Sequence, residues 1–481
     1  MHAHPSQVPA VLLRLDRNPF HHGTLGAVRS LGRTGVEVHA VVEAGGGPMG
    51  RSRYLRAVHP GPSGGLDPEA PEALLECLTG VSEQIGRPAV LIAMDDLSAI
   101  AVSRVAPMLT DRFRIPHQPD DLPARVADKA ELSRLCARWD VPHPETVIPA
   151  SGSEAAEAAW RLGLPVIAKW SRPWLLPSGT GLRSTTLLHA AAEARRLYER
   201  SDEAGSRLLL QRFLPAGPDT DWFFHGAFAR GGRPLITGSG RKEMSWPVRT
   251  GLTAVGRWLP DPAVEEAGLR LAERLGYQGI LDLDFRRDEQ GVFRLVDFNP
   301  RPGAQFRLFT DAGGLDVVQA MYLDLTGQRV PEPSGGPGRV FVAENYALLA
   351  AVRGRSLPRR PPAPPSGAGA AAAPARRGRE RGQVEAAWFA ADDPMPFLAM
   401  LAAFLGRGAF KGLRVLRGVP AQGRRTARAV VRAPHQRGRQ LPPPAAAGAP
   451  GGSAGSAASA GSGTRSAPPE APAEPDELVT R

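Results

Sequence analysis

Acidic and amide side chains are concentrated in one stretch of the chain, residues 279–303, which reads GILDLDFRRDEQGVFRLVDFNPRPG. Two strand-like runs flank the turn residues 288–291, so this stretch is predicted to form a β-hairpin. With Glu289 and Gln290 as a two-residue loop, Asp284 is expected opposite Leu295. A slip of one residue would turn one strand's side chains to the other face, so the register decides which groups meet.

In the expected register, Asp284 shares one face of the hairpin with Asp297 and Asn299. Two carboxylates and an amide oxygen are hard ligands, the kind that Mg²⁺ takes before water and phosphate oxygens fill its other positions. Arg301 follows directly, and a guanidinium can bind phosphate oxygens through two parallel hydrogen bonds. The alternative is a solvated hairpin in which Asn-Pro only makes a turn. The pattern therefore favours a site for Mg²⁺ and phosphate.

The same residues resemble the signature of the ATP-grasp superfamily, which includes biotin carboxylase, D-alanine–D-alanine ligase and D-aspartate-ligase-type carboxylate–amine ligases. Members carry an acidic residue on one strand and an E-x-N-P-R-like segment on the next. Asp284 and the segment DFNPR at 297–301 match this pattern, with the two carboxylates 13 positions apart. The resemblance covers about residues 119–328. It implies ATP and Mg²⁺ (or Mn²⁺) as cofactors, with metal ligands Asp284, Asp297 and Asn299.

The resemblance also implies roles for basic residues. Lys129 stands where the family has its first nucleotide-binding lysine, and Lys169 stands where the second lysine reaches a phosphate of ATP. A lone lysine is more often a surface residue, but two at this spacing before the hairpin favour a nucleotide site. Lys169 and Arg301 are the implied catalytic residues. The loop 301–307 is expected to face the carboxylate substrate, with Arg307 as a candidate to hold it.

By the same resemblance, the strand predicted at 208–214 is the hinge whose backbone pairs with adenine. Gln211 stands there where a Glu is usual, and its amide oxygen can accept a hydrogen bond from the adenine amino group. Asp219 or Asp221 takes the place of the ribose-binding acid. The nucleotide-binding residues implied beside the two lysines are Gln211, Phe213, Leu214, Asp219 and Arg241, with Lys242 sharing the position of Arg241.

The elements that must position these residues follow a pattern of alternating strands and helices. In the first 118 residues, strands are expected at 11–15, 36–42 and 88–94 and helices at 24–33 and 72–85. Such alternation indicates a parallel sheet covered on both faces. Further helices are expected at 128–139, 154–162, 262–275 and 315–326, and strands at 165–170, 208–214, 222–229, 279–285 and 293–298.

The predicted fold class combines α/β and α+β regions. It consists of a Rossmann-like pre-ATP-grasp domain (1–118), an ATP-grasp lid subdomain (119–210), an ATP-grasp C-terminal subdomain with the metal site (211–330), a C-terminal extension (331–420) and a disordered tail (421–481). Pro, Ala and Gly dominate an insertion at 358–374, and such composition does not build a core. Residues 384–405 are apolar enough to dock on the folded body.

Charge is distributed unevenly along the 481 residues, whose net charge is +11. Residues 351–481 hold 20 Lys/Arg and 8 Asp/Glu, whereas residues 1–350 hold 39 and 40. The first 350 residues therefore give no electrostatic reason to expect a polyanion. Two cysteines do not make a disulfide framework, and no apolar run is long enough to span a membrane, so a cytoplasmic protein without a membrane partner is expected.

The function implied by the resemblance is ATP-dependent amide formation between a carboxylate and an amine, through an acyl phosphate. Two alternatives from other classes stay open. One is a catalytically silent ATP-binding module, and the other is a protein that binds nucleic acid through its arginine-rich tail. Small-molecule substrates and a homodimer are the expected partners. The sequence identifies neither the carboxylate nor the amine.

Overall fold

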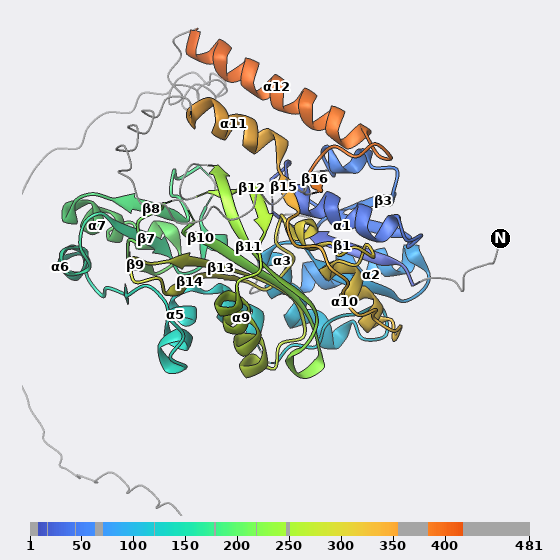
Figure 1. The fold of residues 1–481 in the computed structure, drawn as a ribbon. Helices are drawn as coiled ribbons and strands as arrows, with labels where there is room; N and C mark the ends of the chain where they lie inside the picture. Colours follow the sequence, from blue (N-terminus) through green and yellow to red (C-terminus); the bar gives the residue numbers. More distant parts are fainter. Residues whose placement is uncertain are drawn as a thin grey trace, which may run out of the picture. The chain divides into compact units, whose positions relative to one another are not determined.

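Three β-sheets form the framework of the described part of the chain (Figure 1). The computed structural model describes residues 8–16, 18–43, 45–62, 71–119, 121–177, 179–217, 219–246, 251–354 and 383–416. They belong to the unit Met1–Arg417, and the second unit, Gly418–Arg481, lies outside the described residues. The insertion predicted at 358–374 and the disordered tail predicted at 421–481 also lie outside them.

The N-terminal sheet is parallel, as predicted, with the strand order β3-β2-β1-β4-β5. Its strands are β1 (Ala10–Arg14), β2 (Val38–Val42), β3 (Leu55–Pro60), β4 (Ala89–Ala93) and β5 (Phe113–Arg114), and its helices are α1 (His22–Gly32), α2 (Glu72–Ile85) and α3 (Asp96–Val105). Leu12 of β1 packs in a cluster with α1, whereas Leu13 packs in a cluster with α2 and α3. Helices therefore cover both faces of this sheet.

A four-stranded antiparallel sheet comes next, in the order β6-β9-β7-β8. Its strands are β6 (Thr146–Val147), β7 (Val166–Trp170), β8 (Thr185–Leu188) and β9 (Leu208–Arg212), with helices α4 (Leu122–Ala127), α5 (Lys129–Arg138), α6 (Gly152–Leu162), α7 (Ala191–Tyr198) and α8 (Ser201–Ala204). Asp128 caps α5, because its side chain accepts from the backbone N–H groups of Ala130 and Glu131. This cap fixes Lys129 at the first position of α5.

The largest sheet has seven strands in the order β14-β13-β10-β11-β12-β15-β16. Its strands are β10 (Asp221–Ala229), β11 (Arg233–Trp246), β12 (Leu252–Trp258), β13 (Gly279–Arg287), β14 (Phe293–Asn299), β15 (Val340–Val342) and β16 (Val384–Ala386), with helices α9 (Pro262–Leu275) and α10 (Val317–Leu325). Phe224 of β10 packs in a cluster with α9, whereas its neighbour Phe223 packs in the cluster that contains α10. Successive side chains of one strand thus bind helices on opposite faces.

The predicted hairpin forms from β13 and β14, but its predicted register was wrong. Asp284 lies opposite Asp297, and Phe285 lies opposite Leu295, so Val296 is an extra residue in a β-bulge. The turn is longer than two residues, because the Asp288 N–H donates to the Val292 carbonyl oxygen at 2.9 Å. The bulge and the longer turn together bring the two carboxylates directly face to face.

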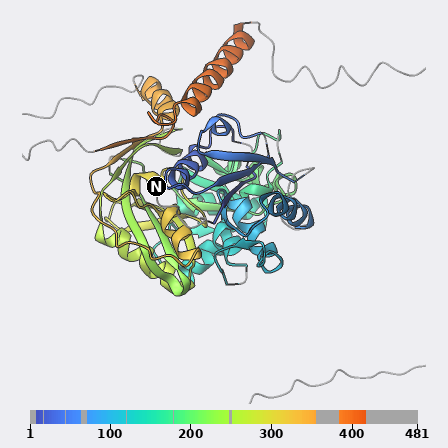
Figure 2. The ribbon, with the colours of Figure 1, turned by 90° about the vertical axis from the view of Figure 1, so that its right-hand side faces the viewer.

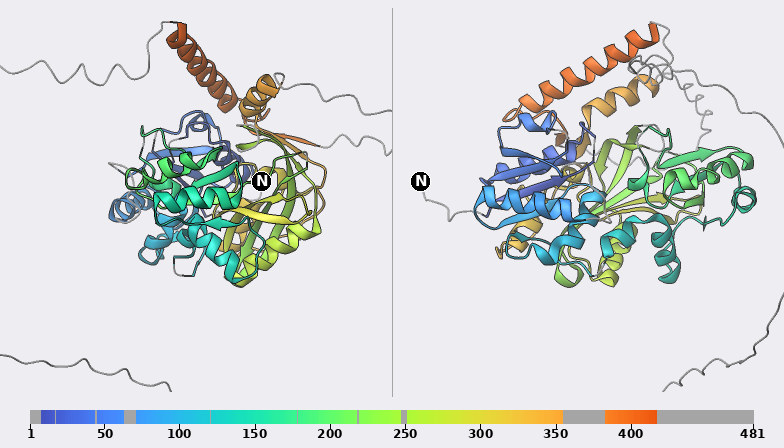
Figure 3. Two further views of the ribbon diagram at one scale, coloured as in Figure 1. Left: turned by 90° about the vertical axis from the view of Figure 1, so that its left-hand side faces the viewer. Right: turned by 180° about the vertical axis from the view of Figure 1, so that it is seen from behind.

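Residues 383–416 pack on this framework through β16 and the start of α12 (Met395–Leu416). The prediction that 384–405 docks on the folded body is confirmed by the buried side chains of Trp388 and Met400. Arg29 of α1 also binds Asp393 in a buried ion pair at 3.0 Å. Figures 2 and 3 show α12 and the neighbouring α11 (Glu344–Gly354) extending beyond the sheets.

Two further expectations concern the cysteines and membranes. Cys77 and Cys136 are both free thiols. In the described ranges, no helix combines the length and apolar character needed to cross a bilayer. The strand β9 ends at Arg212, just past the expected boundary between residues 210 and 211, and the domain boundaries remain predictions.

Candidate functional site

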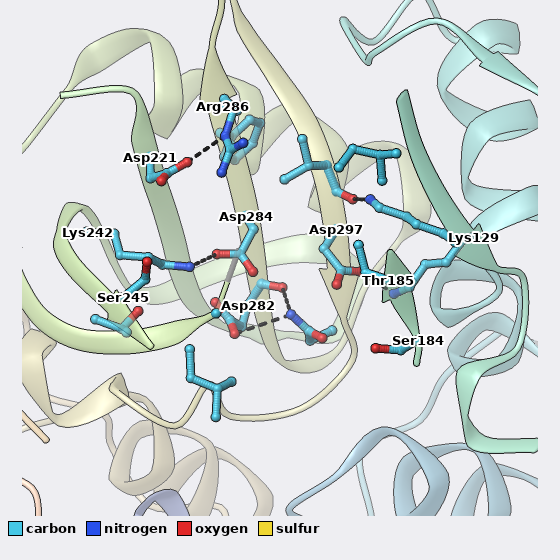
Figure 4. A pocket seen from close by; sticks show the side chains of 18 of the residues that line it. Lys129, Ser184, Thr185, Asp221, Lys242, Ser245, Asp282, Asp284, Arg286 and Asp297 are labelled. Atoms are coloured by element: carbon cyan, nitrogen blue, oxygen red, sulfur yellow. Dashed lines mark hydrogen bonds and ion pairs between the residues drawn. The ribbon is translucent and has the colours of Figure 1, made fainter. Parts of the chain in front are cut away.

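A cavity of about 720 Å³ collects side chains from the four-stranded and seven-stranded sheets and from the N-terminal domain (Figure 4). Lys169 of β7 and Gln211 of β9 line it from the four-stranded sheet, and the hairpin contributes Asp284 and Asp297. Asp96, the first residue of α3, lines it from the N-terminal domain. The volume lies in the range of small-molecule binding sites.

The two opposed carboxylates of the hairpin each have a lysine as partner. Lys242 of β11 places its Nζ 3.4 Å from Asp284 Oδ1, and Lys129 Nζ donates to Asp297 Oδ1. Figure 4 shows Lys242 pointing toward Asp284 across β10, the strand that separates β11 from β13. Like charges directly opposite on two strands destabilise a sheet, so the lysines offset a repulsion that the register creates.

A third carboxylate, Asp282, is buried next to Asn299. His225 Nε2 lies 2.8 Å from Asp282 Oδ1, and Asn299 Nδ2 donates to the Asp282 backbone oxygen at 3.3 Å. Gly303 permits this packing, because a Cβ there would come within 2.3 Å of His225 Cε1. Asp282 therefore holds the amide nitrogen of Asn299 and leaves its oxygen for other partners.

Arg301 connects the hairpin to the N-terminal domain. Its guanidinium donates to Asn299 Oδ1 at 3.1 Å and lies 3.5 Å from Asp282 Oδ2. Its Nε lies 3.2 Å from Asp96 Oδ1. Residues more than 200 positions apart in the chain thus share one charge network at the cavity.

Burial and neighbouring charges shift the pKa values of the two β13 carboxylates in opposite directions. Burial raises the pKa of Asp284, and the nearby charges of Asp282 and Asp297 add to this, although Lys242 opposes it. Burial also disfavours ionisation of Asp282, but its contact with His225 and the charges of Arg301 and Lys242 together outweigh burial and lower its pKa. Asp284 is therefore the carboxylate whose ionisation gains most from an additional cation.

The cavity lysines are also perturbed. Burial lowers the pKa of Lys169 to about 8, although the charge of Asp297 works against this. The Lys169 ammonium donates to the Val296 carbonyl oxygen at 2.9 Å, at the bulge itself. Burial disfavours the charged form of Lys242, yet the charges of Asp284, Asp221 and Asp282 together outweigh burial and raise its pKa.

At the predicted hinge, Gln211 and Leu214 line the cavity, whereas Phe213 lies outside its lining. Gln211 Nε2 donates to Thr146 Oγ1 at 3.0 Å. This bond orients the side-chain amide and leaves its oxygen as an acceptor. Strand β9 lies between β6 and β7 in the sheet, which holds the hinge residues in place.

Of two pairs of candidate residues that lie close together in the sequence, Lys242 with Arg241 and Asp221 with Asp219, only one member each lines the cavity. Lys242 and Asp221 line it, and Asp221 binds Arg286 at 2.7 Å. Arg241 and Asp219 instead bind each other, outside the lining. Successive strand residues point to opposite faces, so β11 directs Lys242 and not Arg241 to the cavity.

Arg307, the candidate for holding the carboxylate substrate, also lies outside the cavity lining. It binds Asp316 at 3.1 Å and Glu385 at 2.7 Å.

Several polar residues at or beside the cavity had not been singled out from the sequence as site residues, among them His21, Asp96, His225 and Asp282. Burial lowers the pKa of His21 well below its usual value, and the charges of Arg14 and Arg301 add to this. His21 follows β1 and Asp96 follows β4. Ligands of open parallel sheets bind beyond the carboxyl ends of the strands, so this position was the signal that could have identified both.

The hairpin supplies only part of the coordination shell that a metal ion requires. In the ranges that the structure describes, no group of three or more His, Cys, Asp or Glu side chains is arranged to hold a metal ion. Asp284, Asp297 and Asn299 provide two carboxylates and one amide on adjacent strands. Mg²⁺ binds few protein oxygens and takes the rest of its shell from water and phosphates. These residues therefore fit a Mg²⁺ ion that binds together with phosphate groups.

Comparison with known proteins gives two similar sequences, while no protein-family model matches the chain. The C-terminal section of the carbamoyl phosphate synthase large chain of Methanopyrus kandleri is 26% identical over 244 residues, covering 47% of this chain and 43% of that protein. D-aspartate ligase of Enterococcus faecium is 24% identical over 242 residues, covering 48% and 56%. The chain thus spans about half the length of these relatives.

Among solved structures, the biotin carboxylase domain dimer of 2-oxoglutarate carboxylase from Hydrogenobacter thermophilus is similar to the chain. That structure contains MgADP, ADP and bicarbonate. It matches with a TM-score of 0.50 and 17% sequence identity, covering 68% of this chain and 72% of that chain. At this level of identity the likeness shows the fold.

Proposed function

Because the chain has the ATP-grasp fold, we propose that it is an ADP-forming ligase that joins a carboxylate to an amine. The observation that carries the proposal is the convergence of Asp284, Asp297 and Asn299 with Lys129 and Lys169 at one cavity. These residues come from β13, β14, α5 and β7. Oxygen ligands and ammonium groups together form the surroundings that a nucleoside triphosphate and its metal ion require.

Asp284, Asp297 and Asn299 would hold Mg²⁺. When bound, the metal ion would neutralise phosphate charge and help to align the transferred group. The lysines now paired with the two carboxylates, Lys242 and Lys129, would then be free to face the phosphate oxygens. Both carboxylates belong to Asp, whose side chain reaches one methylene less far than the Glu that is common in the family.

Lys169 and Arg301 would provide fixed positive charge where negative charge accumulates during phosphoryl transfer. Lys169 is held by its hydrogen bond to the bulge at Val296. Arg301 is held between Asp96 and Asn299. Because these partners position both cations before substrate binds, little reorganisation is needed during the reaction.

The nucleotide base would lie at the hinge, against Gln211 and Leu214, with Phe213 contributing through its backbone. Gln211 has a free amide oxygen for the adenine amino group, because its nitrogen already binds Thr146. We assign the ribose to Asp221, which lines the cavity, in preference to Asp219, which does not. For the same reason Lys242 replaces Arg241 as the cation near the phosphates.

The reaction would proceed in two transfers. A carboxylate oxygen of the substrate attacks the γ-phosphorus of ATP, the bond to the β,γ-bridging oxygen breaks, and ADP leaves with that electron pair. The amine nitrogen then attacks the acyl carbon, the bond to the phosphate oxygen breaks, and inorganic phosphate leaves as the amine loses a proton. Closure of the cavity around its substrates would keep water from the acyl phosphate between the two steps.

The proposal extends to partners and location. A small carboxylate and a small amine suit a cavity of about 720 Å³ that must also take ATP. We propose a homodimer by analogy with the biotin carboxylase domain dimer. Two free cysteines accord with the reducing cytoplasm.

The experiment is chromatographic analysis of nucleotide products with Mg²⁺-ATP and pools of amino acids and small carboxylates, with and without EDTA. The proposal predicts ADP release that one pool stimulates and EDTA abolishes. AMP release would mean adenylate chemistry and would overturn the acyl phosphate. ATP binding without turnover in every pool would favour the silent ATP-binding module.

A further inference from the structure

Helix α12 carries a stripe of exposed apolar side chains that takes no part in the cavity. Met395 is 52% exposed, Leu398 52%, Leu401 37% and Leu405 60%. Positions that recur every three or four residues lie on one face of a helix. Met395, Leu398, Leu401 and Leu405 therefore form one apolar stripe along the described part of the helix.

The opposite face of α12 attaches the helix to the protein. Met400 is buried, and Phe397 and Phe404 pack against the same core cluster as Phe20. The rings of Phe20 and Phe404 meet edge to face at 6.2 Å, and the Arg407 guanidinium lies 4.9 Å from the Phe20 ring. The exposed stripe is therefore not the surface that anchors α12, a helix that extends beyond the sheets (Figures 1 and 2).

The charge of the chain changes sharply at this helix. No Asp or Glu occurs from residue 394 to residue 469, whereas ten Lys or Arg occur between residues 407 and 439. An apolar helical face next to a run of positive charge without acidic residues is the pattern of helices that lie on anionic lipid surfaces. The first 350 residues, with 39 basic and 40 acidic residues, would neither add to nor oppose such binding strongly.

Other occupants of the stripe fit less well. Residues 418–481 contain few large apolar residues to cover it. A second copy of α12 would bring two runs of ten positive charges together. Nucleic acid would bind the positive charges but would leave the leucines in water. We propose that the outer face of α12 binds an anionic lipid surface, the occupant that the ten basic and no acidic residues of the sequence 407–439 favour.

This binding mode is peripheral. The absence of a membrane-crossing helix in the described residues concerns spanning only, because an amphipathic helix lies in the plane of the headgroups. None of the exposed residues of α12 lines the cavity. Lipid binding and nucleotide chemistry can therefore be tested separately, and the lipid proposal does not depend on the proposed ligase activity.

The test is sedimentation of the full-length protein with vesicles of phosphatidylcholine alone, or of phosphatidylcholine with about one-third phosphatidylglycerol. The proposal predicts binding to the anionic vesicles that weakens as salt is added, and little binding to the neutral ones. Absence of binding to anionic vesicles at low salt would overturn it.

A double variant, Leu398→Glu with Leu405→Glu, tests the stripe itself. It should weaken vesicle binding about a hundredfold or more, because two apolar side chains are lost and two charges of the surface's own sign are added. The matched control is Trp160→Glu on α6, a residue 70% exposed, which should bind like the unmodified protein. Both variants should keep the unmodified thermal melting profile, which shows that they fold.

Two results with the double variant would contradict the proposal. Unchanged vesicle binding would mean that the basic residues act without the helix face. A change in sedimenting mass from dimer to monomer, with no loss of vesicle binding, would identify the stripe as an interface between copies of the chain.

Discussion

The hairpin β13–β14 and the hinge strand β9 line the same cavity but present different chemistry to it. At the hairpin, Asp284 and Asp297 face each other, and each is balanced by a lysine from another element. At the hinge, Gln211 and Leu214 offer an amide and an apolar side chain. The comparison suggests that the hairpin acts through charge and the hinge through shape and hydrogen bonds, so changes at the hairpin should cost more activity.

The largest effect is expected from Asp297→Asn, which keeps the shape of the side chain and removes its charge. Turnover should fall about a thousandfold or more, because the metal and the phosphates lose a ligand that no neighbour replaces. The thermal melting temperature should change little, since the Asp297 side chain is 32% exposed and an ion pair with such exposure contributes little to stability. Steady-state ADP formation measures the turnover. If the variant also unfolds, its loss of turnover would not support a role for the charge of Asp297.

A second prediction separates two neighbouring cations on β11. Lys242→Met should reduce kcat/KM for ATP about a hundredfold, because Lys242 faces the cavity beside Asp284. Arg241→Met is the matched control and should change it less than about threefold, since an exposed ion pair such as that with Asp219 contributes little. Equal losses in both variants would contradict the assignment of strand faces.

A third prediction concerns pH. Burial lowers the pKa of Lys169 to about 8, so its ammonium is charged below that pH and loses its charge as the pH rises through that value. The value of kcat/KM for ATP, which reports the free enzyme, should therefore decline about tenfold for each pH unit above about 8. In Lys169→Met, activity is lower throughout and this alkaline decline should be absent. A decline that persists unchanged in the variant would assign it to another group.

The smallest effect is expected at the hinge. Gln211→Ala removes one neutral hydrogen bond to the base, worth about 0.5–1.5 kcal/mol. KM for ATP should rise about threefold to tenfold while kcat stays near its original value, and the preference for ATP over GTP should narrow. A fall in turnover as large as that of Asp297→Asn would contradict the distinction between the hinge and the hairpin.

The hairpin illustrates how far the sequence could predict the site. Local alternation and a turn were enough to predict two strands that carry Asp284 and Asp297 on one face. They were not enough to predict the bulge at Val296, because a bulge depends on the partner strand and leaves no pattern of its own. The predicted and the observed register both keep the two carboxylates on one face. The interpretation as a site for Mg²⁺ and phosphate therefore does not depend on the register.

Contacts between domains could not be predicted from local sequence patterns. The contact of Asp96 with Arg301 joins α3 to the hairpin, and no spacing rule relates two residues that far apart. Lys242 and Arg241 differ only in which face of β11 they occupy, and bulges in β11 between Lys242 and Ser245 make that face uncertain from the sequence. The helices and strands that were predicted are encoded by caps, turns and periodicity within each element, whereas β11 and β12 were not among them.

The most direct test of the central claim follows one oxygen atom. When the carboxylate substrate has been identified, it is labelled with ¹⁸O and converted by the enzyme with Mg²⁺-ATP and the amine, and the phosphate products are analysed by mass spectrometry. An acyl phosphate predicts one ¹⁸O atom in inorganic phosphate for each amide bond formed. Label in AMP, or phosphate that contains no ¹⁸O, would contradict the account.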